Sequence, residues 1–196
     1  MCGIAGFLNP GNNHQKTEKE KYEILRKMNE AQRHRGPDDE GTFLENGCGL
    51  GHVRLSIIDL YRGHQPMCKK REGNTYAIIL NGEIYNMKPL KEQLIKEGEV
   101  FSTTSDTEVV LTGYIRHGIS YMEQLNGIFA IALWDGKRKK LYLIRDRVGV
   151  KPLFYTKQGD TLIFSSEIKG LFAYPGVKPV INREGLCEIF GLGPAK

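Results

Sequence analysis

Cys2 is the first side chain along the sequence that could do covalent chemistry, and it stands directly behind Met1. Removal of Met1 would give one residue both a thiol and a free α-amine, which together make a nucleophile with its own base. The alternative is that Cys2 is a small apolar residue on the first strand of a sheet. The stretch MCGIAGF alone favours this second interpretation, so the rest of the sequence must decide.

The segment NGEIYN, residues 81–86, directly follows the apolar run TYAIIL. Asn81 and Gly82 would place a side-chain amide beside an unhindered backbone N–H, and an oxyanion hole needs two such donors aimed at one point. Asn-Gly is also a frequent pair in hairpin turns. Taken by itself, the segment favours a turn.

One cation and two anions stand close to the ends of expected strands or helices: Arg54, Glu83 and Asp106. An arginine can bind a carboxylate through two parallel hydrogen bonds, and two acidic groups can offset an ammonium. The three charges therefore match the α-carboxylate and α-ammonium of a free amino acid. Each could equally be a surface charge, and the sequence does not show that they converge.

Two further segments are interpreted structurally. HRGPDDEG, residues 34–41, is expected to stop a helix and turn, although its His and Asp could suggest acid–base chemistry. GCGLGH, residues 47–52, lacks the G-x-G-x-x-G spacing and a following helix, so it is expected to be a close-packed strand. No GxxxxGK[ST] motif occurs, and the sequence predicts no nucleotide site in these residues.

The length of 196 residues fits one domain, or one and a small piece of a second. With 40% hydrophobic and 26% charged residues, the chain can form a packed core. The net charge of +5 comes mainly from residues 69–71 and 137–140. These basic clusters could bind nucleic acid. They are short and contain no interleaved aromatic residues, which favours two solvated turns between strands.

Location and metal binding are judged from the cysteines and the apolar runs. The sequence shows no secretory signal pattern, and its longest apolar run, residues 128–134, is too short to cross a bilayer. We therefore expect a cytoplasmic protein with reduced thiols and no membrane contact. Wide cysteine spacing without a CxxC pair argues against a zinc site at Cys2, Cys48, Cys68 and Cys187.

The order of the expected elements is strands, then helices, then strands. Thr17-x-x-Glu20 is a capping box for a helix over 17–34, and Ser105 with Glu108 marks the start of another over 106–117. A further helix is expected over 88–96 and a small one after Asn182. Strands are expected at 3–8, 42–44, 49–54, 75–80, 127–135, 140–146, 153–155 and 162–165. This order favours an α+β sandwich of antiparallel sheets with helices on their faces.

Taken together, these segments resemble those of the class II glutamine amidotransferases, which are N-terminal nucleophile hydrolases. Within this family the sequence is most similar to the amino-terminal glutaminase half of the glutamine-dependent asparagine synthetases. The matching motifs run in order along nearly the whole chain: MCGIAGF, HRGPDDEG, GHVRLSIIDL, GHQPM, LNGEIYN, SDTEVVL, LNGIFAIALWD, RDRVGVKPLFY and FSSEIKGL.

The resemblance implies a four-layer αββα sandwich over residues 2–196 and a role for each candidate residue. Cys2 would be the nucleophile once Met1 is removed, and Asn81 and Gly82 would form the oxyanion hole. The glutamine α-carboxylate would be held by Arg54, and its α-ammonium would be received by Glu83 and Asp106. Leu55 and the backbone at Ile58 would line the pocket.

The resemblance also implies partners. The substrate would be L-glutamine, hydrolysed to glutamate and ammonia without a metal or cofactor. The ammonia would feed an ATP- and Mg-dependent synthetase domain that converts aspartate to asparagine; its pyrophosphate-loop motif is not in this sequence, which is expected to be a fragment. A homodimer is possible, and no nucleic-acid partner is expected. The alternatives are a glutamine-sensing module without catalysis, or an amidotransferase domain serving a different acceptor.

Overall fold

The protein is built on two antiparallel β-sheets, seen in a computed structural model that describes residues 1–10, 16–55 and 63–192. The first sheet has five strands in the order β2-β3-β1-β9-β8, and the second has four in the order β4-β5-β6-β7. The strands are β1 Gly3–Leu8, β2 Asp39–Glu45, β3 Cys48–Arg54, β4 Met67–Arg71, β5 Asn74–Ile84, β6 Gly127–Asp135, β7 Lys140–Arg145, β8 Phe154–Gln158 and β9 Thr161–Ser165.

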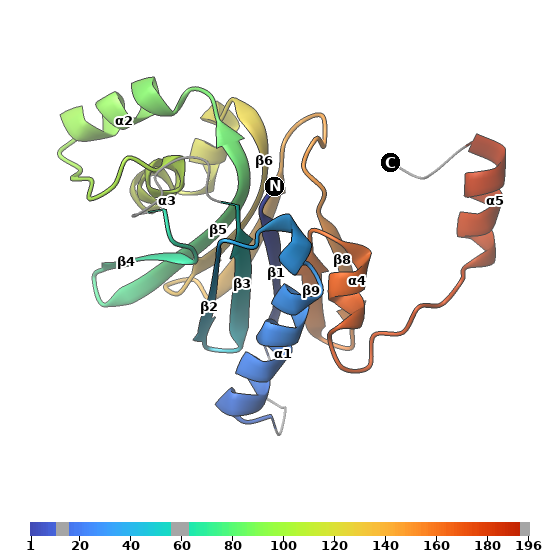
Figure 1. The fold of residues 1–196 in the computed structure, drawn as a ribbon. Coiled ribbons are helices and arrows are strands. Elements are labelled where there is room, and N and C mark those ends of the chain that lie inside the picture. The colour runs from blue at the N-terminus through green and yellow to red at the C-terminus, as the bar shows by residue number, and fades with distance from the viewer. Residues whose placement is uncertain (11–15, 56–62, 193–196) are drawn as a thin grey trace.

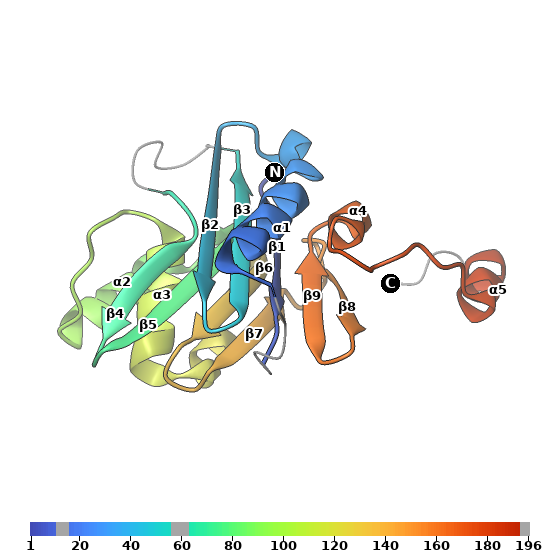
Figure 2. The ribbon, with the colours of Figure 1, turned by 90° about the horizontal axis from the view of Figure 1, so that it is seen from below.

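Helices cover the outer face of each sheet, which gives four layers (Figures 1 and 2). The five-stranded sheet packs on α1 and α4, and the four-stranded sheet packs on α2, α3 and the 3₁₀ helix η2. The helices are α1 Glu18–Glu30, η1 Arg33–Arg35, α2 Met87–Lys96, α3 Asp106–His117, η2 Ile119–Gln124, α4 Ile168–Phe172 and α5 Arg183–Leu192. The predicted α+β class and αββα order are confirmed.

A central core joins the two sheets. Ile4, Leu50 and Phe164 of the first sheet pack against Ile79 and Trp134 of the second, and all five are nearly or fully buried. The strands β1, β5, β6 and β9 alternate between this core and a helix-facing core, as a period of two residues requires. The strand β3 is buried along its whole length, so the close-packed strand predicted for GCGLGH is confirmed.

Two helices begin at their predicted caps, but α1 ends earlier than predicted and α3 has no complete capping box. Thr17 caps α1 and forms the complete capping box with Glu20, as expected. That helix ends at Glu30 rather than at residue 34, and η1 follows it. Ser105 caps α3 by accepting a hydrogen bond from Thr107 N. Glu108 does not complete a box there, because its carboxylate is bound by residues 102 and 103.

Two local predictions were wrong. The basic segment at residues 69–71 belongs to β4 rather than to a solvated turn, and its Lys69 pairs with the buried Glu108 at 2.9 Å. Asn81 and Gly82 lie inside β5 rather than in a hairpin turn, opposite Ala130 and Phe129 of β6. In both segments, pairing with a neighbouring strand overrides the local preference of the residues for a turn.

Candidate active site

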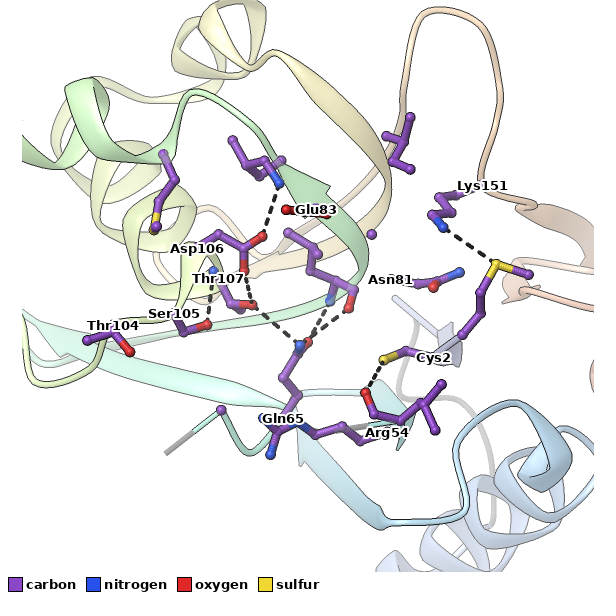
Figure 3. Close-up of a pocket in the computed structure, with 18 residues that line it drawn as sticks. Cys2, Arg54, Gln65, Asn81, Glu83, Thr104, Ser105, Asp106, Thr107 and Lys151 are labelled. Atoms are coloured by element: carbon purple, nitrogen blue, oxygen red, sulfur yellow. Dashed lines mark hydrogen bonds between the residues drawn. The ribbon is translucent and has the colours of Figure 1, made fainter. Parts of the chain in front are cut away.

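A cavity of about 240 Å³ opens at the chain start, between Cys2 and the segment at residues 104–107 (Figure 3). Its lining comes from β3, β5, the start of α3 and residues next to β1, which are far apart in the sequence. Seven of the eight predicted site residues line it: Cys2, Arg54, Leu55, Asn81, Gly82, Glu83 and Asp106. The eighth, Ile58, lies outside the described residues.

Cys2 stands directly before β1 and is half-buried at the edge of the cavity. Its Sγ lies 3.8 Å from the carbonyl oxygen of Leu55, to which the thiol donates. The side chain therefore faces the cavity rather than the apolar core between the sheets. The interpretation of Cys2 as an apolar strand residue is thus not supported by its surroundings.

Asn81 places an unused donor at the same cavity. The side chain is 1% exposed, and Asn81 Nδ2 has no hydrogen-bond partner within the described structure. A buried N–H group without a partner costs about 1–3 kcal/mol, so such a group in a cavity wall is a natural place for a ligand acceptor. Figure 3 shows Asn81 and Cys2 at the same end of the cavity.

Gly82 follows Asn81 with a φ of 153°, a conformation that residues with a Cβ rarely adopt. A Cβ at this position would also collide with the carbonyl oxygen of Ile128 on the neighbouring strand. Glycine is therefore required here for two independent reasons. The glycine allows β5 and β6 to pair closely at this point of the cavity wall.

The charged residues lie along the rest of the lining. Arg54, at the end of β3, is 7% exposed. Asp106, the first residue of α3, accepts a hydrogen bond from Ile84 N at 3.1 Å. Burial raises the pKa of Asp106, and the neighbouring Glu83 raises it further, although hydrogen bonds from Ile84 and Thr107 oppose these effects. The cavity lining thus includes the cationic side chain of Arg54 and the acidic side chains of Glu83 and Asp106.

Glu108 holds the segment that carries Asp106. Its buried carboxylate accepts hydrogen bonds from the backbone N–H groups of Ser102 and Thr103 and pairs with Lys69. Burial raises the pKa of Glu108, but the hydrogen bonds from Thr103 and Lys69 outweigh this and lower it to about 2. The carboxylate is therefore charged at neutral pH and fixes the loop before α3.

Three residues at or next to the site escaped the sequence reasoning. Arg35 Nε donates to the carbonyl oxygen of Cys2 at 3.0 Å, a contact that the helix stop and turn expected for HRGPDDEG does not predict. Lys151 and Gln65 line the cavity, and the Lys151 ammonium lies 3.5 Å from Met1 Sδ. Lys151 lies in the family motif RDRVGVKPLFY and Gln65 in the family motif GHQPM. Membership of these motifs is the one feature of the sequence that could have pointed to the two residues.

The described part of the chain contains neither a cluster of metal ligands nor a membrane-spanning helix. Within residues 1–10, 16–55 and 63–192, no group of three or more His, Cys, Asp or Glu side chains could hold a metal ion. The four cysteines are free thiols. No helix in this part of the chain is long and apolar enough to span a bilayer.

Comparison with known proteins gives consistent matches. Residues 1–195 match the family described as "Glutamine amidotransferase domain". The chain is 44% identical to asparagine synthetase [glutamine-hydrolyzing] 3 of Bacillus subtilis over its full length and covers 31% of that protein. It is 39% identical to amidase chry2 of Gibberella zeae, with 91% of the chain and 27% of the relative covered. The chain thus spans about a third of these relatives or less.

A solved structure shares the architecture. The glutamine phosphoribosylpyrophosphate amidotransferase of Bacillus subtilis superposes with a TM-score of 0.73, at 22% sequence identity, over 88% of this chain and 43% of that one. At this identity the likeness speaks for the fold alone. It agrees with the two antiparallel sheets and their flanking helices.

Proposed function

Because the chain belongs to the glutamine amidotransferase domain family, we propose that its cavity hydrolyses L-glutamine to L-glutamate and ammonia. The observation that carries the proposal is the placement of the Cys2 thiol and the unpartnered amide of Asn81 at one end of a cavity whose lining also holds Arg54 and Asp106. A thiol and a free donor suit acyl transfer, and the charges suit an amino acid.

The reaction would begin with attack of Cys2 Sγ on the side-chain carbonyl carbon of glutamine. Once Met1 is removed, the α-amine of Cys2 can take the thiol proton. An α-amine has an ordinary pKa of about 7.7–8.0, so part of it is neutral near pH 7 and can act as a base. The amine must be uncapped for this step, since an amide nitrogen cannot take the proton.

The tetrahedral oxygen formed by this attack carries the developing negative charge. Asn81 Nδ2 and the backbone N–H of Gly82 would donate to it, and donors fixed in advance stabilise such charge strongly. The C–N bond of the amide then breaks, ammonia leaves with the proton from the thiol, and a thioester remains. Water attacks the thioester, releases glutamate and restores the Cys2 thiol.

The other end of glutamine would be bound by its charges. Arg54 would take the α-carboxylate with two parallel hydrogen bonds, while Asp106 and Glu83 would face the α-ammonium. Leu55 lines the cavity beside Cys2 and would contact the aliphatic part of the substrate. No metal or cofactor enters this scheme, because an N-terminal thiol and its amine supply both nucleophile and base.

We propose residues 2–196 as the amidotransferase domain of a cytoplasmic enzyme, in which ammonia passes to an ATP- and Mg-dependent synthetase domain that makes asparagine from aspartate. The glutamine-hydrolysing asparagine synthetases among the relatives support this acceptor. A relative at 39% identity is named an amidase rather than an asparagine synthetase, so a different acceptor is kept as the alternative. A homodimer of the complete protein is part of the proposal.

The test measures glutamate and ammonia released from glutamine by the chain, with an intact mass of the same sample to establish removal of Met1. The proposal expects equal amounts of both products, and none from Cys2→Ala. If the processed chain binds glutamine in calorimetry but releases neither product, the domain is a glutamine sensor instead. Activity that persists in Cys2→Ala would remove the proposed nucleophile.

A further inference from the structure

Gln65 occupies an unusual position beside β5. The antiparallel pairing of β4 with β5 ends at Met67 and Ile78. The same register, continued by two residues, places Gln65 opposite Leu80. There the side chain takes over the pairing: Leu80 N donates to Gln65 Oε1 at 2.6 Å, and Gln65 Nε2 donates to Leu80 O at 3.3 Å. A primary amide thus replaces the peptide groups of a neighbouring strand.

The same amide also reaches the start of α3. Gln65 Nε2 donates to Thr107 Oγ1 at 3.3 Å, and that hydroxyl donates to Asp106 Oδ1 at 3.4 Å (Figure 3). Leu80 directly precedes Asn81. One side chain therefore ties the residue before the unpartnered Asn81 amide to the helix that begins with Asp106.

These contacts engage both N–H donors and the carbonyl oxygen of the Gln65 amide. Its amide has two N–H groups and one carbonyl oxygen, and each has found a partner in the protein. The residue is 7% exposed although it lines the cavity. A side chain whose donors are all bound to protein has little to offer a substrate, which favours a role acting through its neighbours.

His52 also faces Leu80. Its Nε2 lies 3.3 Å from Leu80 O, and burial lowers the pKa of His52 to about 4. The imidazole is therefore neutral at neutral pH and, with Nε2 protonated, would share the Leu80 carbonyl with Gln65. The Leu80 N–H, in contrast, has Gln65 Oε1 as its partner. Loss of Gln65 would leave this buried N–H unpaired.

We infer that Gln65 is a positioning residue for the proposed hydrolysis: it fixes the backbone beside the oxyanion donor Asn81 and links it to the ammonium-binding end at Asp106. This inference rests on the proposed function. A shift of about 1 Å in a catalytic group can cost roughly 10²-fold in rate, so a contact that fixes the backbone next to Asn81 can control turnover without touching substrate.

The first test compares Gln65→Leu with the unsubstituted chain, both with Met1 removed. We expect kcat to fall by roughly 10²-fold, while iodoacetamide alkylates Cys2, followed by peptide mass, at an unchanged rate. Gln93→Leu is the matched control, because Gln93 is exposed on α2 and its side chain donates to Glu97 on the same surface. It should keep full activity.

Two further variants separate positioning from a loss of folding. Gln65→Glu keeps the acceptor for Leu80 N but can donate to Leu80 O only when the new carboxyl is protonated. Its kcat relative to the unsubstituted chain should therefore fall as the pH rises, which a purely structural role would not produce. Thr107→Val removes the hydroxyl that links Gln65 to Asp106 while leaving the Gln65 contacts with Leu80 in place, and it should raise KM more than it lowers kcat.

The outcomes are distinct. Full turnover in Gln65→Leu, or a turnover loss matched by an equal loss of Cys2 alkylation, would overturn the positioning role. A pH-independent ratio for Gln65→Glu would also contradict it. If the unsubstituted, processed chain releases no glutamate, the proposed function fails first and the positioning role falls with it.

Discussion

The guanidinium of Arg35 holds the main chain of Cys2: its Nε donates to the Cys2 carbonyl oxygen at 3.0 Å. The same guanidinium pairs with Glu167 at 3.0 Å, and the Arg35 side chain is 9% exposed. Cys2, which would supply both nucleophile and base, is thus held at its carbonyl oxygen by Arg35. Arg35 is in turn held by its ion pair with Glu167. The Cys2 thiol remains free to face the cavity.

Arg35→Leu should lower kcat by at least tenfold, because Cys2 would lose a charge-assisted contact worth about 1.5–3 kcal/mol. Steady-state kinetics on glutamine provide the measurement. Arg33→Leu is the matched control, since Arg33 is exposed and pairs with Glu30 on the surface. Equal activity of the two variants would show that the Arg35 contact does not matter for turnover.

Asn81→Ala should lower kcat by about 10²–10³-fold with a modest change in KM, because one oxyanion donor contributes about 2.7–4 kcal/mol to the transition state. Asn74→Ala, at the other end of the same strand, serves as control. A loss of tenfold or less in Asn81→Ala would count against the oxyanion role. Thermal unfolding of both variants excludes a general effect on the fold.

Arg54→Lys should mainly raise KM for glutamine. Lysine keeps the positive charge, but its ammonium cannot form the two parallel hydrogen bonds that a guanidinium gives to a carboxylate. Arg116→Lys on the surface, where the side chain is 42% exposed, should behave like the unsubstituted chain. An unchanged KM in Arg54→Lys would remove Arg54 from the carboxylate site.

Asp106 gives a prediction about pH. Its pKa is raised above the ordinary 3.8, first by burial and also by Glu83. Its charge, needed for the substrate ammonium, is thus lost on acidification at a higher pH than for a free aspartate, so KM should rise there. Above the raised pKa, the buried carboxylate of Asp106 is charged and lowers the free energy of unfolding. Protonation of Asp106 removes this loss of stability as the pH falls.

Asp106→Asn should therefore raise KM strongly at pH 7 and leave the melting temperature equal or higher, since the amide oxygen can still accept from Ile84 N. KM measured across pH and a thermal melt at pH 7 are sufficient. A lower melting temperature with an unchanged KM would mean that Asp106 supports the fold rather than the substrate.

Much of the fold could be predicted from local sequence. The capping box at Thr17 and Glu20, the serine cap at residue 105 and the hairpin around residues 135–136 all correspond to observed element boundaries. These features depend on residues only a few positions apart, so periodicity and turn chemistry are sufficient to find them. The family motifs, which occur in order along the chain, then indicated the family and the candidate site residues.

The errors arose where distant strands decide the local structure. Asn81-Gly82 has the local chemistry of a turn, but β6 pairs with it and keeps it extended. Lys69 belongs to a basic run, yet its ammonium is placed against the buried Glu108 by the pairing of β4 with β5. The contact between Arg35 and Cys2 spans 33 positions. A local sequence pattern cannot predict contacts between residues so far apart in the sequence.

The most direct test of the central claim is the mass of the covalent intermediate. The Met1-free chain is mixed with glutamine, quenched in acid during turnover, digested and analysed by mass spectrometry. The account predicts one glutamyl group on the peptide that begins with Cys2, absent when glutamine is omitted. Glutamate released without any adduct on that peptide, or an adduct on Cys68 or Cys187 alone, would contradict it.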